Sequence, residues 1–121
     1  MTKILIVEDD YALADNLQAL LKLKGFDVQF APDGEAGVEA ARSYLPDLIL
    51  LDIMIPRISG FEVCRILRGD PKTKSAKIVM VTGLDRMGDV EKAFSSGASD
   101  YLIKPFDSER LFKKIEKVLK G

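Results

Sequence analysis

DLILLDIMIPRISG, residues 47–60, combines an unbroken apolar run with an acid, a proline and a glycine. Its apolar run, residues 48–51, shows no polar alternation, which is typical of a strand buried on both faces of a parallel sheet. The run stops at Asp52, and Pro56 and Gly60 then indicate a loop. A carboxylate there is costly to desolvate unless it is paired, binds a metal or lies in a cleft. From this stretch alone, Asp52 is either a turn residue or a functional one.

The composition describes a globular protein in water with room for a core. The chain has 121 residues, of which 47% are hydrophobic and 31% charged. A net charge of −1 provides no basic field for nucleic acid or a membrane surface. No apolar run is long enough to span a bilayer, and the N-terminus does not have the pattern of a signal peptide. We therefore expect one cytoplasmic domain, residues 1–121, that binds neither nucleic acid nor membrane directly.

Two residue types narrow the possible chemistry. The one cysteine, Cys64, excludes an internal disulfide and fits a reducing compartment. The chain has no histidine, which removes the usual general base and the commonest nitrogen ligand for metals. Any bound metal is therefore expected to be a hard cation with oxygen ligands.

Short apolar runs alternate with segments of helical spacing. Strands are expected over residues 3–7, 26–31, 47–51, 77–81 and 99–103. Helices are expected between Asp10 and Gly25, from Asp33 to about Tyr44, over 60–68, over 88–96 and after Asp107. Asp10, Asp33 and Asp107 are expected to cap the helices that follow them. Such alternation predicts an α/β fold with a parallel sheet.

Polar residues follow four of the five strands. Glu8 and Asp9 follow the first strand, Asp52 the third, Thr82 the fourth and Lys104 the fifth. In open parallel sheets, ligands bind beyond the carboxyl ends of the strands. Three carboxylates brought together there would repel one another, unless a cation such as Mg²⁺, or alternatively Mn²⁺, lay among them. The sequence therefore predicts a phosphoryl-handling site in which Asp52 is the nucleophile and Thr82 donates to the phosphoryl group.

Each of these residues also has an ordinary interpretation. Asp9 could cap a helix, Thr82 could form a local turn bond, Lys104 could be solvated and Tyr101 could belong to the core. Their coincidence at consecutive strand ends favours the functional interpretation.

Four motifs resemble the receiver domain of two-component response regulators, the family of the chemotaxis regulator CheY. They are ILIVEDD (4–10), LILLDIMIP (48–56) with Gly60, VMVTG (79–83) and GASDYLIKPF (97–106). The resemblance covers essentially the whole chain, and no core motif position departs from the family. It implies a flavodoxin-like, three-layer (βα)5 fold whose five-stranded parallel sheet has the order 2-1-3-4-5.

The resemblance also implies a role for each residue. Asp52 would accept the phosphoryl group, and Asp9 would bind Mg²⁺ directly. Glu8 would act through water, and the backbone carbonyl of Met54 would complete the protein ligands.

Thr82 and Tyr101 would form a conformational switch, and Lys104 would bind the phosphoryl group. The peptide bond between Lys104 and Pro105 would be cis.

The implied function is phosphorelay signalling rather than turnover catalysis, with slow autodephosphorylation. Because the chain has no histidine, the donor must be a sensor histidine kinase, a histidine phosphotransfer protein or a small phosphodonor. The chain is either a stand-alone receiver acting on a downstream effector, or part of a larger regulator with a fused output domain. It is either a monomer or a phosphorylation-dependent dimer through the fourth helix, fifth strand and fifth helix.

Three rival classes are less well supported. A flavin-binding protein of the same architecture needs a phosphate-cradling loop after the first strand, where Glu8, Asp9 and Asp10 would repel phosphate. An aspartate-nucleophile phosphatase would carry its nucleophile after the first strand and usually needs a longer chain. A purely structural binding module would not need Thr82 and Lys104 beside the acids.

Two positions are expected to tune the lifetime of the phosphoryl form. Met54 and Leu84 lie two residues past Asp52 and Thr82, where a side chain could orient the attacking water. Neither side chain is suited to orient water, so we expect slow hydrolysis.

Overall fold

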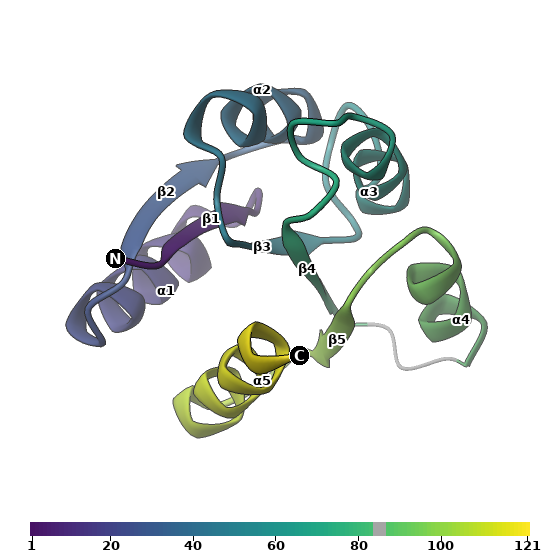
Figure 1. Cartoon of the computed structure of the whole chain (residues 1–121). Helices are drawn as coiled ribbons and strands as arrows, with labels where there is room; N and C mark the ends of the chain where they lie inside the picture. Colours follow the sequence, from purple (N-terminus) through teal and green to yellow (C-terminus); the bar gives the residue numbers. More distant parts are fainter. Residues whose placement is uncertain (84–86) are drawn as a thin grey trace.

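Five parallel strands form one sheet in the order β2-β1-β3-β4-β5 (Figure 1). The computed structural model describes residues 1–83 and 87–121. The strands are β1 (Lys3–Val7), β2 (Asp27–Ala31), β3 (Leu48–Asp52), β4 (Lys77–Thr82) and β5 (Asp100–Ile103). The helices in the described part are α1 (Tyr11–Leu23), α2 (Gly34–Tyr44), α3 (Gly60–Arg68), α4 (Met87–Ser95) and α5 (Ser108–Lys120). The expected fold class and strand order are confirmed.

Helices cover both faces of the sheet, which gives three layers (Figure 1). Alternate residues of a strand point to opposite faces, so β3 contributes to two separate cores. Ile49 and Leu51 pack with α2, α3 and α4, whereas Leu48 and Leu50 pack with α1 and α5. This two-sided burial explains why the strand carries no polar alternation.

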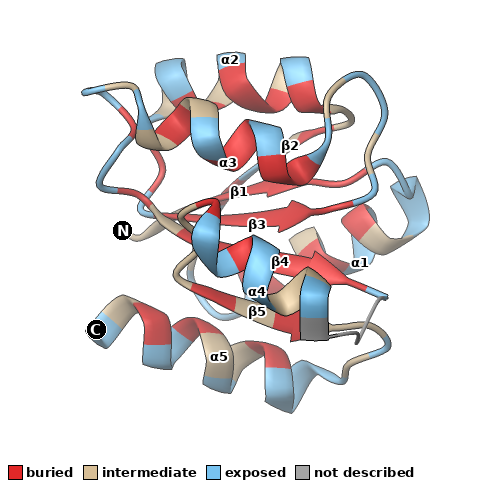
Figure 2. Cartoon of the chain, turned by 90° about the vertical axis from the view of Figure 1, so that its right-hand side faces the viewer, coloured by how far each residue is buried: buried red, intermediate tan, exposed pale blue. Residues whose placement is uncertain are grey.

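β3 lies at the centre of the sheet, and all five of its residues are buried (Figure 2). It begins and ends one residue later than expected, at Leu48–Asp52 instead of 47–51. The ladder continues past the apolar run, because Asp52 is in register with Val81 and the next amide, of Ile53, bonds the Val81 carbonyl at 3.2 Å. Asp52 is therefore the last residue of a central strand, and the ladder on the β4 side fixes its backbone.

Asp10, Asp33 and Asp107 cap α1, α2 and α5 as expected. Their carboxylates accept hydrogen bonds of 3.1, 2.9 and 2.8 Å from the amides of Leu13, Ala36 and Arg110, respectively. Caps of this kind stabilise a helix by about 1 kcal/mol each. Asp10 is thereby assigned to helix capping, which separates it from the two acids that precede it.

Because the strands are parallel, the carboxyl ends of all five strands lie on the same side of the molecule, to the right in Figure 2. The chain order reverses between β1 and β3, which are neighbours in the sheet. This is the point at which open α/β sheets bind their ligands. None of the helices in the described ranges is long and apolar enough to cross a membrane.

Candidate functional site

Three carboxylates meet where β1 and β3 end. Glu8, Asp9 and Asp52, here called the acidic site, each offer an oxygen atom within 4.8 Å of the others. They meet because β1 and β3 are in register up to their last apolar pair, Val7 and Leu51. Glu8 and Asp52 are buried and Asp9 is exposed, so the acidic site opens to solvent on the side of Asp9.

Lys104 brings one positive charge to the acidic site from the end of β5. Its Nζ lies 3.1 Å from Oε1 of Glu8 and 3.1 Å from Oδ2 of Asp52. The Lys104 amide also bonds the Thr82 carbonyl at 2.7 Å, which fixes the start of this loop to β4. Three ionised carboxylates and one ammonium leave two negative charges in excess. One divalent cation with oxygen ligands would balance that excess, so the donor set fits Mg²⁺.

Burial and the neighbouring charged groups shift the pKa values of two residues at the site. Burial, followed by the neighbouring Asp52 carboxylate, raises the pKa of Glu8 from 4.5 to about 7, although Lys104 acts in the opposite direction. Burial lowers the pKa of Lys104, but hydrogen bonds to Glu8 and Asp52 outweigh it and leave that pKa raised. Keeping every acid ionised is therefore costly when no cation is bound.

Both oxygens of Asp52 are held by donors. Oδ1 accepts from the Met54 amide at 3.0 Å, and Oδ2 accepts from Lys104. Gly60 lets the start of α3 close against the strand end, because a Cβ there would lie 2.5 Å from the Asp52 carbonyl oxygen. No side-chain pattern could indicate the Met54 amide as a donor, since nearly every residue has one.

Thr82 lies on the strand next to Asp52. It ends β4 one residue beyond Val81, the register partner of Asp52, and it is buried at 2% exposure. Tyr101 lies farther out, on β5, in register with Met80. Its ring forms a T-shaped pair with the Phe94 ring of α4, with 5.9 Å between the centroids and 87° between the planes.

The remaining predicted positions differ in how far the structure describes them. The Met54 side chain is exposed at 67%, in the loop after β3. The peptide bond between Lys104 and Pro105 is cis. Leu84 lies outside the described residues.

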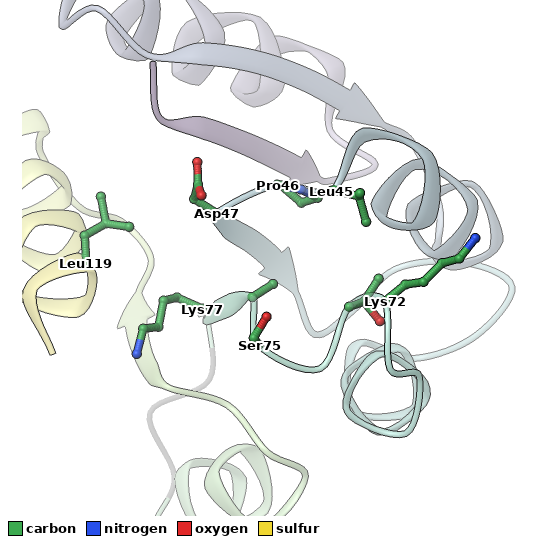
Figure 3. A pocket seen from close by; sticks show the side chains of 9 residues that line it. Leu45, Pro46, Asp47, Lys72, Ser75, Lys77 and Leu119 are labelled. Atoms are coloured by element: carbon green, nitrogen blue, oxygen red, sulfur yellow. The ribbon is translucent and has the colours of Figure 1, made fainter.

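A hollow of about 370 Å³ lies on the opposite side of the molecule, at the amino ends of the strands (Figure 3). The connections before β3 and β4 form most of its wall, and α5 contributes Leu119. Its one acid, Asp47, already accepts a hydrogen bond of 2.8 Å from the Lys3 amide. None of the predicted site residues that the structure describes lines this hollow, so the acidic site is identified by the chemistry of its residues.

The model of the response regulator receiver domain family matches residues 4–116. The DNA-binding dual master transcriptional regulator RpaA of Synechocystis is 42% identical over 120 residues, 99% of this chain and 50% of that protein. Response regulator PleD of Caulobacter vibrioides is 42% identical over 113 residues, 93% of this chain and 25% of that protein. The chain thus spans half or less of these two relatives.

Solved structures agree with the sequence relatives. Chemotaxis response regulator CheY4 of Vibrio cholerae has a TM-score of 0.93 and 29% identity, with 98% of each chain covered. The receiver domain of sensor histidine kinase PA1611 from Pseudomonas aeruginosa has a TM-score of 0.91 and 28% identity, covering 99% of this chain and 98% of that one. The chain therefore belongs to the receiver domain family of response regulators, which act in two-component signalling.

Proposed function

We propose that residues 1–121 form one receiver domain that accepts a phosphoryl group on Asp52 and then changes conformation to control a partner. The observation that carries this proposal is the acidic site, with three carboxylates within 4.8 Å and Lys104 bonded to Asp52. The acids form the arrangement that a divalent cation needs, and the ammonium is available to a phosphoryl oxygen.

Asp9, Asp52 and the Met54 carbonyl would hold Mg²⁺, with Glu8 acting through water, and Mn²⁺ could replace it. The bound cation supplies neutralising charge and a coordination position for a phosphoryl oxygen. The structure of the PA1611 receiver domain is described with a magnesium ion coordinated in its active site cleft.

The chain's own residues perform the transfer by position and charge. A carboxylate oxygen of Asp52 attacks phosphorus and forms a new O–P bond, while the bond from phosphorus to the donor breaks and its electron pair leaves with the donor. A carboxylate nucleophile needs no general base, because its attack on phosphorus releases no proton. Lys104 and the Thr82 hydroxyl stabilise the charge on the transferring phosphoryl oxygens.

The phosphoryl donor must come from outside the chain, which has no histidine. A sensor histidine kinase or a histidine phosphotransfer protein fits, as does a small acyl phosphate. The output is a downstream effector or a fused domain. We place the receiver domain in the cytoplasm, where it binds neither nucleic acid nor a membrane directly. The protein acts as a monomer or as a phosphorylation-dependent dimer through α4, β5 and α5.

Intact-mass measurement tests the proposal. With Mg²⁺ and acetyl phosphate the wild-type chain should gain one phosphoryl group, and EDTA or Asp52→Asn should abolish the gain. Asp47→Asn, which lies directly before the same central strand, serves as the control and should be phosphorylated normally. Phosphorylation that persists in Asp52→Asn would show that the acceptor is wrongly assigned.

Phosphorylation is proposed to draw Thr82 toward the phosphoryl group and to let Tyr101 turn inward, which changes the face formed by α4, β5 and α5. The charge of the phosphoryl group then shifts the equilibrium between two conformations of this face. When beryllofluoride, a phosphoryl mimic, binds, changes in the NMR chemical shifts of backbone amides should extend from Asp52 to Tyr101. Shifts confined to the acidic site would contradict the switch.

The lifetime of the phosphoryl form is proposed to depend on Met54 and Leu84. Apolar side chains beside the attack path do not orient water, so the variant with Met54→Asn and Leu84→Glu should lose phosphate faster. Phosphate release after donor removal, at constant Mg²⁺, measures this. Equal or slower release in the double variant would exclude these side chains as the determinants.

A further inference from the structure

Lys114 of α5 reaches around the free edge of the sheet at β5. Among the described strands, β5 lies at the edge of the sheet and pairs only with β4, and its neighbouring residues Asp100 and Tyr101 point to opposite faces. The Lys114 ammonium lies 3.1 Å from Oδ1 of Asp100 and 5.5 Å from the centroid of the Tyr101 ring. One side chain thus contacts residues on both faces of the strand.

Asp100 fixes the Lys114 side chain in place. The Asp100 side chain is 11% exposed and that of Lys114 24%, whereas the Lys113 side chain is 76% exposed and pairs with Glu109. Lys117 lies 3.6 Å from the other Asp100 oxygen. A carboxylate this buried needs a partner charge, so the ammonium of Lys114 is anchored and does not sample solvent freely.

The Tyr101 ring lies between two helices as a result. Phe94 of α4 contacts it edge-on, and Lys114 of α5 contributes the ammonium. A cation near an aromatic face is attracted to the electron-rich ring, most strongly where water is partly excluded. If the ring turned inward, it would lose its contact with the Lys114 ammonium, because the ion pair with Asp100 keeps that ammonium in place.

We propose that Lys114 is a positioning residue for Tyr101, and that its ion pair with Asp100 sets the fraction of resting protein in which the ring is turned inward. This inference rests on the proposed switch at Thr82 and Tyr101. A cation–π contact at a partly exposed site has the strength to change that fraction about two- to fivefold.

Fluorotyrosine labelling of the full chain tests this directly. The chain has three tyrosines, and the variants Tyr11→Phe and Tyr44→Phe assign the Tyr101 ¹⁹F resonance. In Lys114→Gln without phosphodonor, this resonance should move toward its position in the wild-type protein saturated with Mg²⁺ and beryllofluoride. Beryllofluoride should also bind about two- to fivefold more tightly, because apparent affinity rises with the competent fraction.

Three further variants separate positioning from a general structural effect. Lys114→Arg keeps a cation near both Asp100 and the ring and should behave as wild type. Lys113→Gln removes a neighbouring charge that pairs with Glu109 and should change nothing. Asp100→Asn releases the ammonium and should change the resonance and the affinity in the same direction as Lys114→Gln.

The affinity for beryllofluoride is the deciding measurement. Removal of the Lys114 ammonium also shifts the Tyr101 ¹⁹F resonance directly, even when the ring does not move. If beryllofluoride moves the Tyr101 resonance in every variant but binds Lys114→Gln and wild type equally, the inference is wrong and the proposed function stands. If beryllofluoride binds yet leaves the Tyr101 resonance unmoved in wild type, the proposed switch is wrong and the inference falls with it.

Discussion

Glu8, just past β1, and Asp100, at the start of β5, are both buried, with 2% and 8% exposure, but they have opposite surroundings. Glu8 lies with two other carboxylates and shares a single ammonium with Asp52. Asp100 has two lysines to itself, at 3.1 and 3.6 Å. Among the residues that the structure describes, the fold therefore balances one buried acid with nearby lysines and leaves the other in a cluster where carboxylates outnumber ammonium groups.

The difference gives a physical criterion for telling a structural acid from a candidate ligand-binding one. Burying a charge is costly whether or not it has a role, and a nearby opposite charge recovers much of that cost. Around Asp100 the chain itself supplies that charge. Around Glu8 a single ammonium, that of Lys104, faces three carboxylates, and the pKa of Glu8 rises to about 7, mainly through burial. An undercompensated cluster at the reversal point of the sheet is thus a stronger sign of ligand binding than burial alone.

The largest expected effect is that neutralising Asp100 and neutralising Asp52 change the free energy of unfolding in opposite directions. In EDTA, Asp100→Asn should lower the free energy of unfolding by about 1–3 kcal/mol, because it removes a charged hydrogen-bond acceptor. Asp52→Asn should raise it by roughly 1 kcal/mol, because it relieves repulsion within the acidic site. Urea unfolding followed by circular dichroism measures both. Equal losses in the two variants would mean that the acidic site is not undercompensated.

A smaller effect concerns pH. The pKa of Glu8 is raised from 4.5 to about 7 in the folded protein, so the folded state binds more protons than the unfolded state between these values. The free energy of unfolding of the metal-free protein should therefore fall as the pH rises through this window, and Glu8→Gln should reduce the fall. Urea midpoints in EDTA at several pH values measure it.

The control for the pH effect is Glu109→Gln, which neutralises a carboxylate that is 75% exposed. It should leave the dependence on pH as in wild type. If Glu8→Gln and Glu109→Gln gave identical pH profiles, Glu8 would not be the titrating group.

The smallest effect tests whether the loop after β3 takes part in the charge balance. Arg57 is an exposed residue with a φ of 79°, a conformation that favours glycine. If Arg57 is only strained, Arg57→Gly should raise the free energy of unfolding by about 0.5–1 kcal/mol. If its charge helps to balance the acids, the variant should instead be less stable. Arg57→Asn, which removes the charge but tolerates this conformation, is the matched control.

Most of the fold could be predicted from the sequence, because the apolar runs and the capping acids act locally. Asp10, Asp33 and Asp107 each cap the helix that follows, as their positions before helical patterns indicate. The boundaries of β3 were off by one residue, since ladder hydrogen bonds extend to Asp52 regardless of its polarity.

The site could be predicted only as a set of residues. The convergence of Glu8, Asp9 and Asp52 follows from parallel strands that end in acids, and the structure brings them within 4.8 Å. The burial of Asp100 and its pairing with Lys114 could not be predicted, because two residues on different elements carry no shared local pattern. Long-range pairs of this kind depend on how α5 packs against the sheet edge.

Chemical trapping of the phosphorylated residue tests the central claim most directly. Borohydride reduces an aspartyl phosphate to homoserine, and tandem mass spectrometry then locates the changed residue. After incubation with Mg²⁺ and acetyl phosphate, homoserine should be found at position 52 and should disappear when EDTA is present. Homoserine at Asp9, Asp10 or Asp100 in place of Asp52 would contradict the proposed function of the acidic site.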